Sequence, residues 1–177
     1  MHHSLIGYDA KAESDDSGSV DLNISDIYVN TSGMHLKGNG SMTDIMGDDP
    51  LIRVDGSLEA SLDSLESFIP DSLHMHAEGK IDAHIEGNAR LSHLNLYNFS
   101  RAALNGSLSF EDIHIHTPGD SICVKIDTLG ISAGPEEIQS RRDSSRKFRL
   151  MAVNGYINDA DIRYRNEISL KGKSIRM

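Results

Sequence analysis

The sequence predicts an all-β protein with long antiparallel strands in a curved, repeat-like sheet. First, apolar residues or glycine alternate with polar residues from 73 to 91, in LHMHAEGKIDAHIEGNARL. A period of two is typical of an extended strand with one apolar and one polar face. Second, shorter alternations of the same kind fill most of the chain, separated by turn sequences such as NTSG (30–33) and GDDP (47–50). Third, only 5% of the residues are aromatic and Trp is absent, so aliphatic side chains must form the apolar surface.

The N-terminal part is expected to hold a lead-in followed by three strands. Residues 1–18, which include KAESDDSGS, predict a flexible polar lead-in, and residues 19–177 one β-rich domain. In VDLNISDIYV (20–29) the apolar phase changes near Ser25 and Asp26, and one extra residue there predicts a β-bulge. Residues 34–42 and 51–60 then alternate regularly.

One short helix is expected at about 61–69, where SLDSLESFI has apolar residues at helical spacing and Pro70 ends the segment. The apolar phase of 73–91 is unbroken, which argues against a tight two-residue hairpin within it. That segment is therefore either one long strand bent at Gly79 and Gly87, or two strands joined by a three-residue loop.

The C-terminal half is expected to contain further strands around one loop. Apolar alternation continues over 94–110, and the segments 113–115, 121–127 and 128–133 predict short strands. The sequence GPEEIQSRRDSSRK (134–147) is charged and unpatterned, which predicts a mobile loop, and three strands follow.

A weak internal repeat is visible in three segments that carry glycine on the apolar phase. They are DGSLEA (55–60), EGKIDA (78–83) and NGSLSF (105–110). Repeats of this size normally stack side by side. The alternative is that these glycines only reflect the many turns of an all-β chain.

The composition and motifs argue against several classes of function. The net charge of −10 works against binding nucleic acid. One cysteine allows no internal disulfide, and no apolar run reaches the ~18 residues of a membrane-spanning helix. Motifs of hydrolases, nucleotide-binding loops and zinc proteases are absent from the sequence, and no signal peptide is visible. We therefore expect no enzyme activity, no catalytic residue and no cofactor.

The histidines raise the question of a metal site. Two H-x-H pairs, His74 with His76 and His114 with His116, could each share a zinc ion from one strand face. A site would need third and fourth ligands, to which Glu78 and Asp82 on the same face could contribute. We expect solvated histidines and no metal. Cys123 has no evident activating partner in the sequence.

An apolar sheet face must be covered by something, and one short helix cannot cover many strands. Either the sheet folds into a taco or sandwich with a self-filled core, or it forms a half-pipe that holds acyl chains. Small residues on the apolar phase leave width for a ligand or for close sheet contact. The residues expected to line such a groove are Leu73, Met75, Ala77, Ile81, Ala83, Ile85, Ala89, Leu91, Leu104 and Leu108.

Two stretches, EGKIDAHIEGNARLSHLNLYNFSRAALNGSLSFEDIHI and VNGYINDADIRYRNEISL, resemble the AsmA-like family of bacterial envelope proteins, which is related to TamB and to bridge-like lipid-transfer proteins. The resemblance covers roughly residues 50–170. It implies a β-groove in the periplasm that guides phospholipids and supports outer-membrane biogenesis.

The resemblance also implies partners and a larger context. The family's N-terminal transmembrane helix is not present in this sequence, so we expect a segment of a longer, inner-membrane-anchored chain or an abbreviated relative. The expected partners are phospholipid acyl chains, the membrane through an anchor in the parent chain, and other copies through sheet edges. The alternative is a self-filled structural or adhesive β-domain that binds a protein or a glycan.

Overall fold

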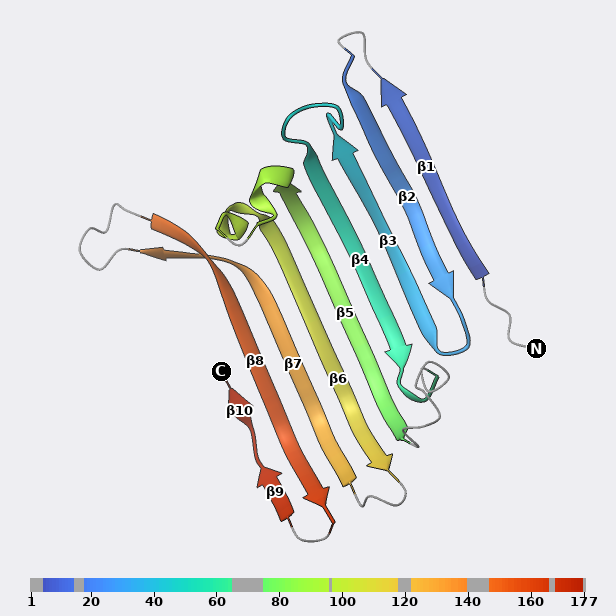
Figure 1. The fold of residues 1–177 in the computed structure, drawn as a ribbon, viewed down its shortest axis with the longest axis vertical. Helices are drawn as coiled ribbons and strands as arrows, with labels where there is room; N and C mark the ends of the chain where they lie inside the picture. The colour runs from blue at the N-terminus through green and yellow to red at the C-terminus, as the bar shows by residue number, and fades with distance from the viewer. Residues whose placement is uncertain are drawn as a thin grey trace.

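The computed structural model is a single sheet of ten strands, each antiparallel to its neighbours (Figure 1). The structure describes residues 5–14, 18–64, 75–95, 97–117, 122–139, 147–165 and 168–176. The strands are β1 (Leu5–Ser14), β2 (Val20–Asn30), β3 (Met34–Thr43), β4 (Leu51–Ser61), β5 (His76–Arg90), β6 (Ala103–Thr117), β7 (Ile122–Gln139), β8 (Lys147–Tyr164), β9 (Ile168–Gly172) and β10 (Ile175–Arg176). The predicted all-β fold with long antiparallel strands is confirmed.

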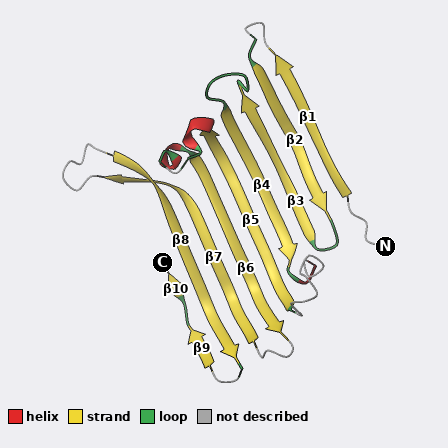
Figure 2. Cartoon of the chain, in the orientation of Figure 1, coloured by secondary structure: helices red, strands yellow, loops and turns green. Residues whose placement is uncertain are grey.

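The strands follow one another across the sheet in chain order from β1 to β8, and both β9 and β10 pair with β8. Figure 2 shows the strands as one layer, with two short 3₁₀ helices, η3 (Leu91–His93) and η4 (Phe99–Arg101), between β5 and β6. Within the described ranges, the outer strands β1 and β8–β10 do not pair with each other, and no second sheet packs on the first. The described residues therefore form an open curved sheet, and they do not form a sandwich with a self-filled core.

A β-bulge interrupts β2 where the apolar phase changes. Asp26 pairs with Asp9 of β1 but Ile24 pairs with Ala10, so Ser25 is an extra residue. The register with β3 shifts at the same place. The predicted bulge at Ser25 and Asp26 is therefore confirmed.

A second line of irregularities crosses β6, β7 and β8 at Asp112, Asp127 and Asp159. The pairs on either side of these three residues keep one register, so the three aspartates lie side by side. Asp112 and Asp159 have φ values of 53° and 42°, the left-handed region that aspartate tolerates better than most residues. The register of β5 against β6 also shifts here, opposite Gly79. The apolar phase changes at each aspartate, and the sheet bends along this line.

The long alternating segment is one strand, β5, with Gly79 and Gly87 at φ values of 129° and 132°. The single bent strand was one of the two alternatives, and it is the one observed. The expected helix at 61–69 lies mostly outside the described residues, because only positions up to 64 are described there and Ser61 ends β4.

Two expectations for irregular segments are wrong. Residues 5–14 of the expected lead-in form β1, whose alternating Ile6, Tyr8, Ala10 and Ala12 pair with β2. Residues 134–139 and 147 of the expected loop belong to β7 and β8, which pair as far as Gln139 and Lys147. The segments 121–127 and 128–133 are also not separate strands, because β7 runs through both with Asp127 at the junction.

The sheet has almost no buried core in the described residues. The buried apolar residues are Ala60, Ala77, Ala89, Ala102 and Ile113, and no large side chain is fully buried. The molecule exposes 12893 Å². A compact protein of 19.4 kDa would expose about 8,500 Å². The difference indicates a single layer with both faces open.

Candidate functional site

The register gathers the apolar residues of the strands on one face of the sheet, here called the apolar face. Two lateral rows on this face cross all strands from β1 to β8 without a polar side chain. The first, called the glycine row, is Tyr8, Ile27, Gly38, Gly56, Ile85, Gly106, Ala133 and Val153. The second, called the leucine row, is Ile6, Val29, Leu36, Leu58, Ala83, Leu108, Ile131 and Gly155.

The glycine row has unoccupied space on both sides of its central side chain, because small residues flank that side chain. Ile85 pairs with Gly56 on one side and with Gly106 on the other. With no side chains beside it, Ile85 remains 45% exposed. A methyl group built on Gly56 would lie 3.8 Å from Ile85 Cγ2, and one on Gly106 would come no closer than 3.7 Å to His84 O. A Cβ would therefore fit at both positions, but both residues are glycine and the space beside Ile85 stays open.

The apolar face is large for a surface that remains exposed. At about 4.8 Å between strands, the seven steps from β1 to β8 span roughly 34 Å. With strands of ten or more residues, the face covers on the order of 1,000 Å². The largest apolar patch of a typical monomer is about 300–600 Å², and larger patches mark binding surfaces.

The predicted groove residues lie mostly together. Seven of the ten share the apolar face: Ala77, Ile81, Ala83, Ile85 and Ala89 on β5, and Leu104 and Leu108 on β6. Met75 precedes β5, Leu91 begins η3 and is 52% exposed, and Leu73 lies outside the described residues. The sequence reading missed the same face on the other strands.

The missed residues carry a recognisable signal. At each change of phase, two polar residues, one of them aspartate, separate two apolar-face residues. The four segments are ISDI (24–27), FEDI (110–113), IDTL (126–129) and INDA (157–160). If one extra residue is allowed at each of these aspartates, the short alternating segments join into long strands.

The connection between β5 and β6 closes one end of the sheet. Its helix η4 lies next to β8, two strands beyond β6, and its Ala102 is fully buried (Figure 1). Asp49, in the turn between β3 and β4, accepts hydrogen bonds from the backbone N–H of Ser92 at 2.8 Å and from its hydroxyl at 2.9 Å. These hydrogen bonds, the backbone one first, hold the pKa of Asp49 below its ordinary value.

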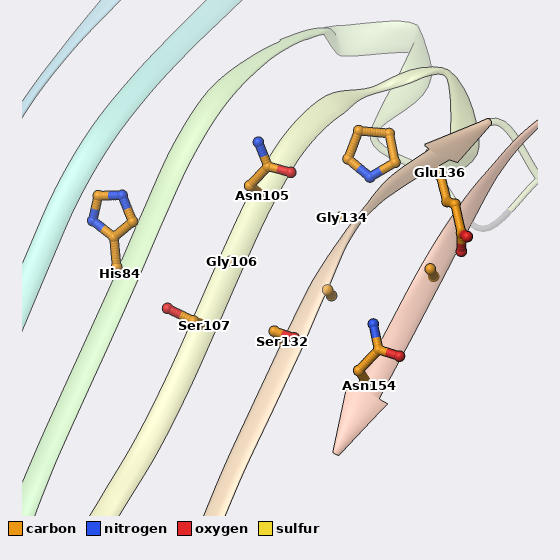
Figure 3. Close-up of a pocket in the computed structure, with 11 residues that line it drawn as sticks. His84, Asn105, Gly106, Ser107, Ser132, Gly134, Glu136 and Asn154 are labelled. Atoms are coloured by element: carbon orange, nitrogen blue, oxygen red, sulfur yellow. The ribbon is translucent and has the colours of Figure 1, made fainter. Parts of the chain in front are cut away.

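The opposite, polar face carries a shallow pocket of about 400 Å³ (Figure 3). Figure 3 shows its polar side chains on four separate strands, with His84 on β5, Asn105 and Ser107 on β6, Ser132 on β7 and Asn154 on β8. They follow the flat strand surface, where Asn105 Nδ2 donates a hydrogen bond to Glu86 Oε1 at 3.5 Å and His84 Nε2 lies 3.7 Å from Glu86 Oε2. Because these polar side chains stand on four separate strands, they do not converge on one point as the polar groups of a typical substrate site do.

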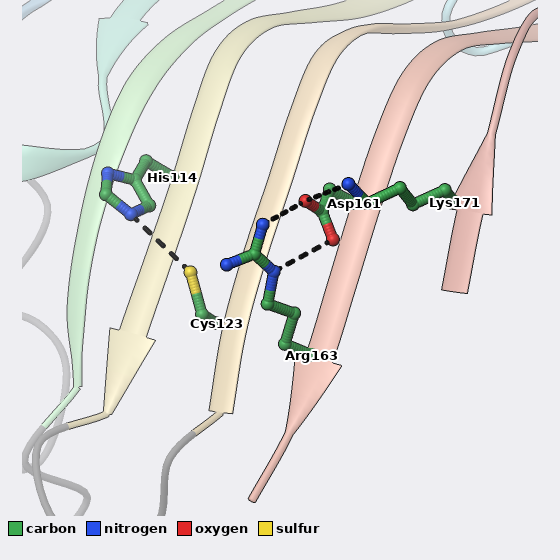
Figure 4. A network of polar contacts seen from close by, with 5 residues as sticks. All are labelled: His114, Cys123, Asp161, Arg163 and Lys171. Atoms are coloured by element: carbon green, nitrogen blue, oxygen red, sulfur yellow. Dashed lines mark hydrogen bonds and ion pairs between the residues drawn. The ribbon is translucent and has the colours of Figure 1, made fainter. Parts of the chain in front are cut away.

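Cys123 has a neighbour that the sequence reading did not identify. Its Sγ lies 3.7 Å from His114 Nε2 (Figure 4). On the other side of the imidazole ring, His114 Nδ1 lies 3.9 Å from Glu78 Oε2. The order Glu–His–Cys resembles that of a nucleophile with its base, but both distances exceed the ~2.6–3.2 Å of catalytic proton transfer. His114 and Glu78 are also 40% and 74% exposed, so water reaches the group.

Next to it, Arg163 donates two hydrogen bonds to Asp161, at 2.7 and 3.2 Å, and Lys171 Nζ lies 3.8 Å from the same carboxylate (Figure 4). The hydrogen bonds from Arg163 lower the pKa of Asp161; desolvation opposes them, and the charges of Arg163, Lys171 and Lys125 lower the pKa further by smaller amounts. In the part of the chain that the structure describes, no three His, Cys, Asp or Glu side chains come together as metal ligands. His74 lies outside that part.

The fold and the face define the class of protein as an open, single-layer β-sheet with one polar and one exposed apolar surface. Comparisons with protein-family models, with curated proteins and with solved structures find no match to this chain. None of the described helices has the length and hydropathy needed to cross a bilayer.

Proposed function

We propose that this chain is a non-enzymatic, lipid-handling segment of an AsmA-like protein in the periplasm of a bacterial envelope. Its apolar face would hold phospholipid acyl chains and so contribute to lipid transport and outer-membrane biogenesis. One observation carries the proposal: two rows free of polar side chains cross eight strands and remain exposed, with Ile85, Ile131 and Val153 at 45%, 47% and 65%. The AsmA-like resemblance supplies the cellular context.

Acyl chains suit this face because their burial needs no directional contact. The backbone polar groups of the inner strands are used in pairing with neighbouring strands on both sides, so the face offers contact area and no hydrogen bonds. Each buried methylene contributes about 0.8 kcal/mol, so ten methylenes contribute roughly 8 kcal/mol before ordering costs. This is enough to hold one chain, and it leaves the headgroup in water.

The glycine row supplies a path for such a chain. It runs across the strands, with Gly56 and Gly106 leaving depth on either side of Ile85. Because no polar side chain interrupts the row from β1 to β8, an acyl chain meets a similar surface along its whole length. Weak, uniform contact of this kind permits movement along the face, which transport requires.

A structural or adhesive β-domain is the second candidate. In that case the apolar face would be covered by a protein partner, and the polar face with its pocket at His84 and Asn105 would bind a protein or a glycan. Unlike the lipid proposal, this one predicts that the isolated chain carries no lipid.

The test is native mass spectrometry of the chain purified from bacterial cells, followed by lipid extraction of the same sample. We expect co-purifying phospholipid, which is lost when Ala83→Trp and Ile85→Asp are introduced on the apolar face. The matched control is His84→Asp, since the His84 side chain lies on the opposite face and is 46% exposed, close to Ile85 at 45%. A wild-type protein free of lipid, or equal loss in the control, would contradict the proposal.

A further inference from the structure

The two edges of the sheet carry opposite charge. On the first edge, β1 and β2 have four carboxylates, Asp9, Glu13, Asp21 and Asp26, against the single Lys11, a net charge of −3. On the other edge, residues 147–165 and 168–176 have seven Lys or Arg against two Asp, a net charge of +5. The whole chain has a net charge of −10, so this basic edge is a local feature.

Both edges also have free backbone for pairing. β1 has ten residues and, among the described strands, pairs only with β2. On the other side, β9 pairs with 160–164 of β8 and β10 with 156–157, so the described residues 147–155 of β8 pair only with β7. The free part of β8 is nine residues long, which nearly matches the length of β1.

The strand directions of the two edges are compatible. Successive strands from β1 to β8 alternate, so β8 runs opposite to β1 (Figure 1). A second copy placed beside β8 in the same orientation would therefore present its β1 antiparallel to residues 147–155. In line with this docked β1 lies β10, which carries Arg176 and follows Lys173.

The apolar rows reach both edges and are most exposed there. Ile6 and Tyr8 on β1 are 71% and 79% exposed, and Val153 on β8 is 65% exposed, against 45% for Ile85 in the middle. A strand added in register would place its apolar side chains beside these residues and continue the rows. Edge strands with unpaired backbone groups are the usual places for such pairing.

We propose that copies of this chain associate head to tail, with the acidic β1–β2 edge of one copy against the basic β8–β10 edge of the next. The contact uses different surfaces on the two copies, so each added copy leaves a free edge from which the sheet can extend further. The apolar face grows by the width of one sheet with each added copy. The inference does not depend on lipid binding.

The association should depend on salt and on charge. Opposite charges at exposed edges attract less as ionic strength rises, since the screening length is about 10 Å at 0.1 M salt and about 3 Å at 1 M. Asp9→Lys with Glu13→Lys changes the first edge from −3 to +1, so both edges are basic. Arg149→Glu with Lys173→Glu and Arg176→Glu changes the second edge from +5 to −1, so both edges are acidic. Each variant then repels itself, but the two are complementary to each other at both contacts.

The experiment is sedimentation velocity of the full chain over a concentration series at low and high salt. We expect the wild type to associate at low salt with at least tenfold weaker association at 1 M salt, both edge variants to remain monomeric, and their equimolar mixture to associate again. Asp55→Lys with Glu59→Lys changes the net charge of central strand β4 by the same amount as the acidic-edge variant, and should associate as the wild type does.

A wild type that stays monomeric would overturn the inference. Association of both edge variants at wild-type strength would also overturn it, because it would indicate contact between apolar faces. A mixture that stays monomeric would do so as well. A monomeric wild type that carries lipid would overturn the head-to-tail contact while leaving the proposed function standing.

Discussion

Replacing Gly56 and Gly106 with valine is expected to stabilise the sheet and to weaken lipid binding. Both glycines lie mid-strand on the apolar face, and neither has a left-handed φ. A Cβ at Gly56 would come no closer than 3.6 Å to another heavy atom, and one at Gly106 no closer than 3.7 Å, which are ordinary contacts. The backbone therefore does not require glycine at either position.

The size of the stability effect follows from backbone entropy. Glycine within a strand costs roughly 0.5–1 kcal/mol relative to alanine, and β-branched residues suit strands better still. The two substitutions together should raise the free energy of unfolding by about 1–2 kcal/mol. The valine side chains would also fill the space beside Ile85 from both sides, so the glycine row would lose its depth.

The assay pairs urea denaturation with quantification of co-purifying phospholipid. Ser57→Val with Ser107→Val is the matched control, because these residues follow the two glycines in sequence and lie on the polar face. We expect the glycine variant to gain stability and lose most of its lipid, and the serine variant to keep its lipid. Unchanged lipid in a stabilised glycine variant would refute the role given to the glycine row.

Three further predictions concern the bend and the end closure. Asp112→Val should cost about 1–2 kcal/mol in urea unfolding, because its φ of 53° disfavours a β-branched residue, whereas Asp112→Asn should be nearly neutral; equal effects would contradict this. The lowered pKa of Asp49 means that its contribution to stability is present above the ordinary carboxyl pKa and is lost as the pH falls through the lowered one. The protection factor of the Ser92 amide, which is its exchange rate corrected for the intrinsic pH dependence, should therefore fall on acidification, and Asp49→Asn should remove that fall; a fall that persists in this variant would argue against the contact. Ala102→Leu should cost about 1–3 kcal/mol, since this residue is 0% exposed; a neutral result in the same unfolding assay would indicate free space there.

The strand content and the phase of the central strands could be predicted from the sequence because they depend on local alternation. The unbroken phase of 73–91 predicted an unusually long strand, and β5 is such a strand. The bulge in β2 could be predicted for the same reason, since two alternating runs with opposite phase meet at Ser25 and Asp26. Both features are properties of one segment.

The features that could not be predicted depend on pairing between segments. Asp112, Asp127 and Asp159 each interrupt the alternation of their own strand, and only the shared register shows that they form one bend across three strands. Without that register, β7 and β8 were divided into shorter strands and a loop. β1 was missed because Ala10 and Ala12 carry little hydrophobic signal, and its position depends on pairing with β2.

The candidate site was predicted in part for a related reason. The residues on β5 and β6 were found because each strand alternates clearly, and the register brings Ala83 next to Leu108. The length of the apolar rows, from β1 to β8, depends on eight strands keeping their phases aligned. Likewise, no local pattern places Cys123 beside His114, since the two residues lie on neighbouring strands.

In the proposed function, acyl chains lie on the apolar face and not on the polar one. Photo-crosslinking in bacterial cells can distinguish the two faces, with benzoylphenylalanine placed at Ile85 in one variant and at the adjacent His84 in another. We expect the probe at position 85 to form adducts with the mass of phospholipid, and the probe at position 84 to form none. Equal lipid adducts at both positions, or adducts only at position 84, would contradict the proposed function.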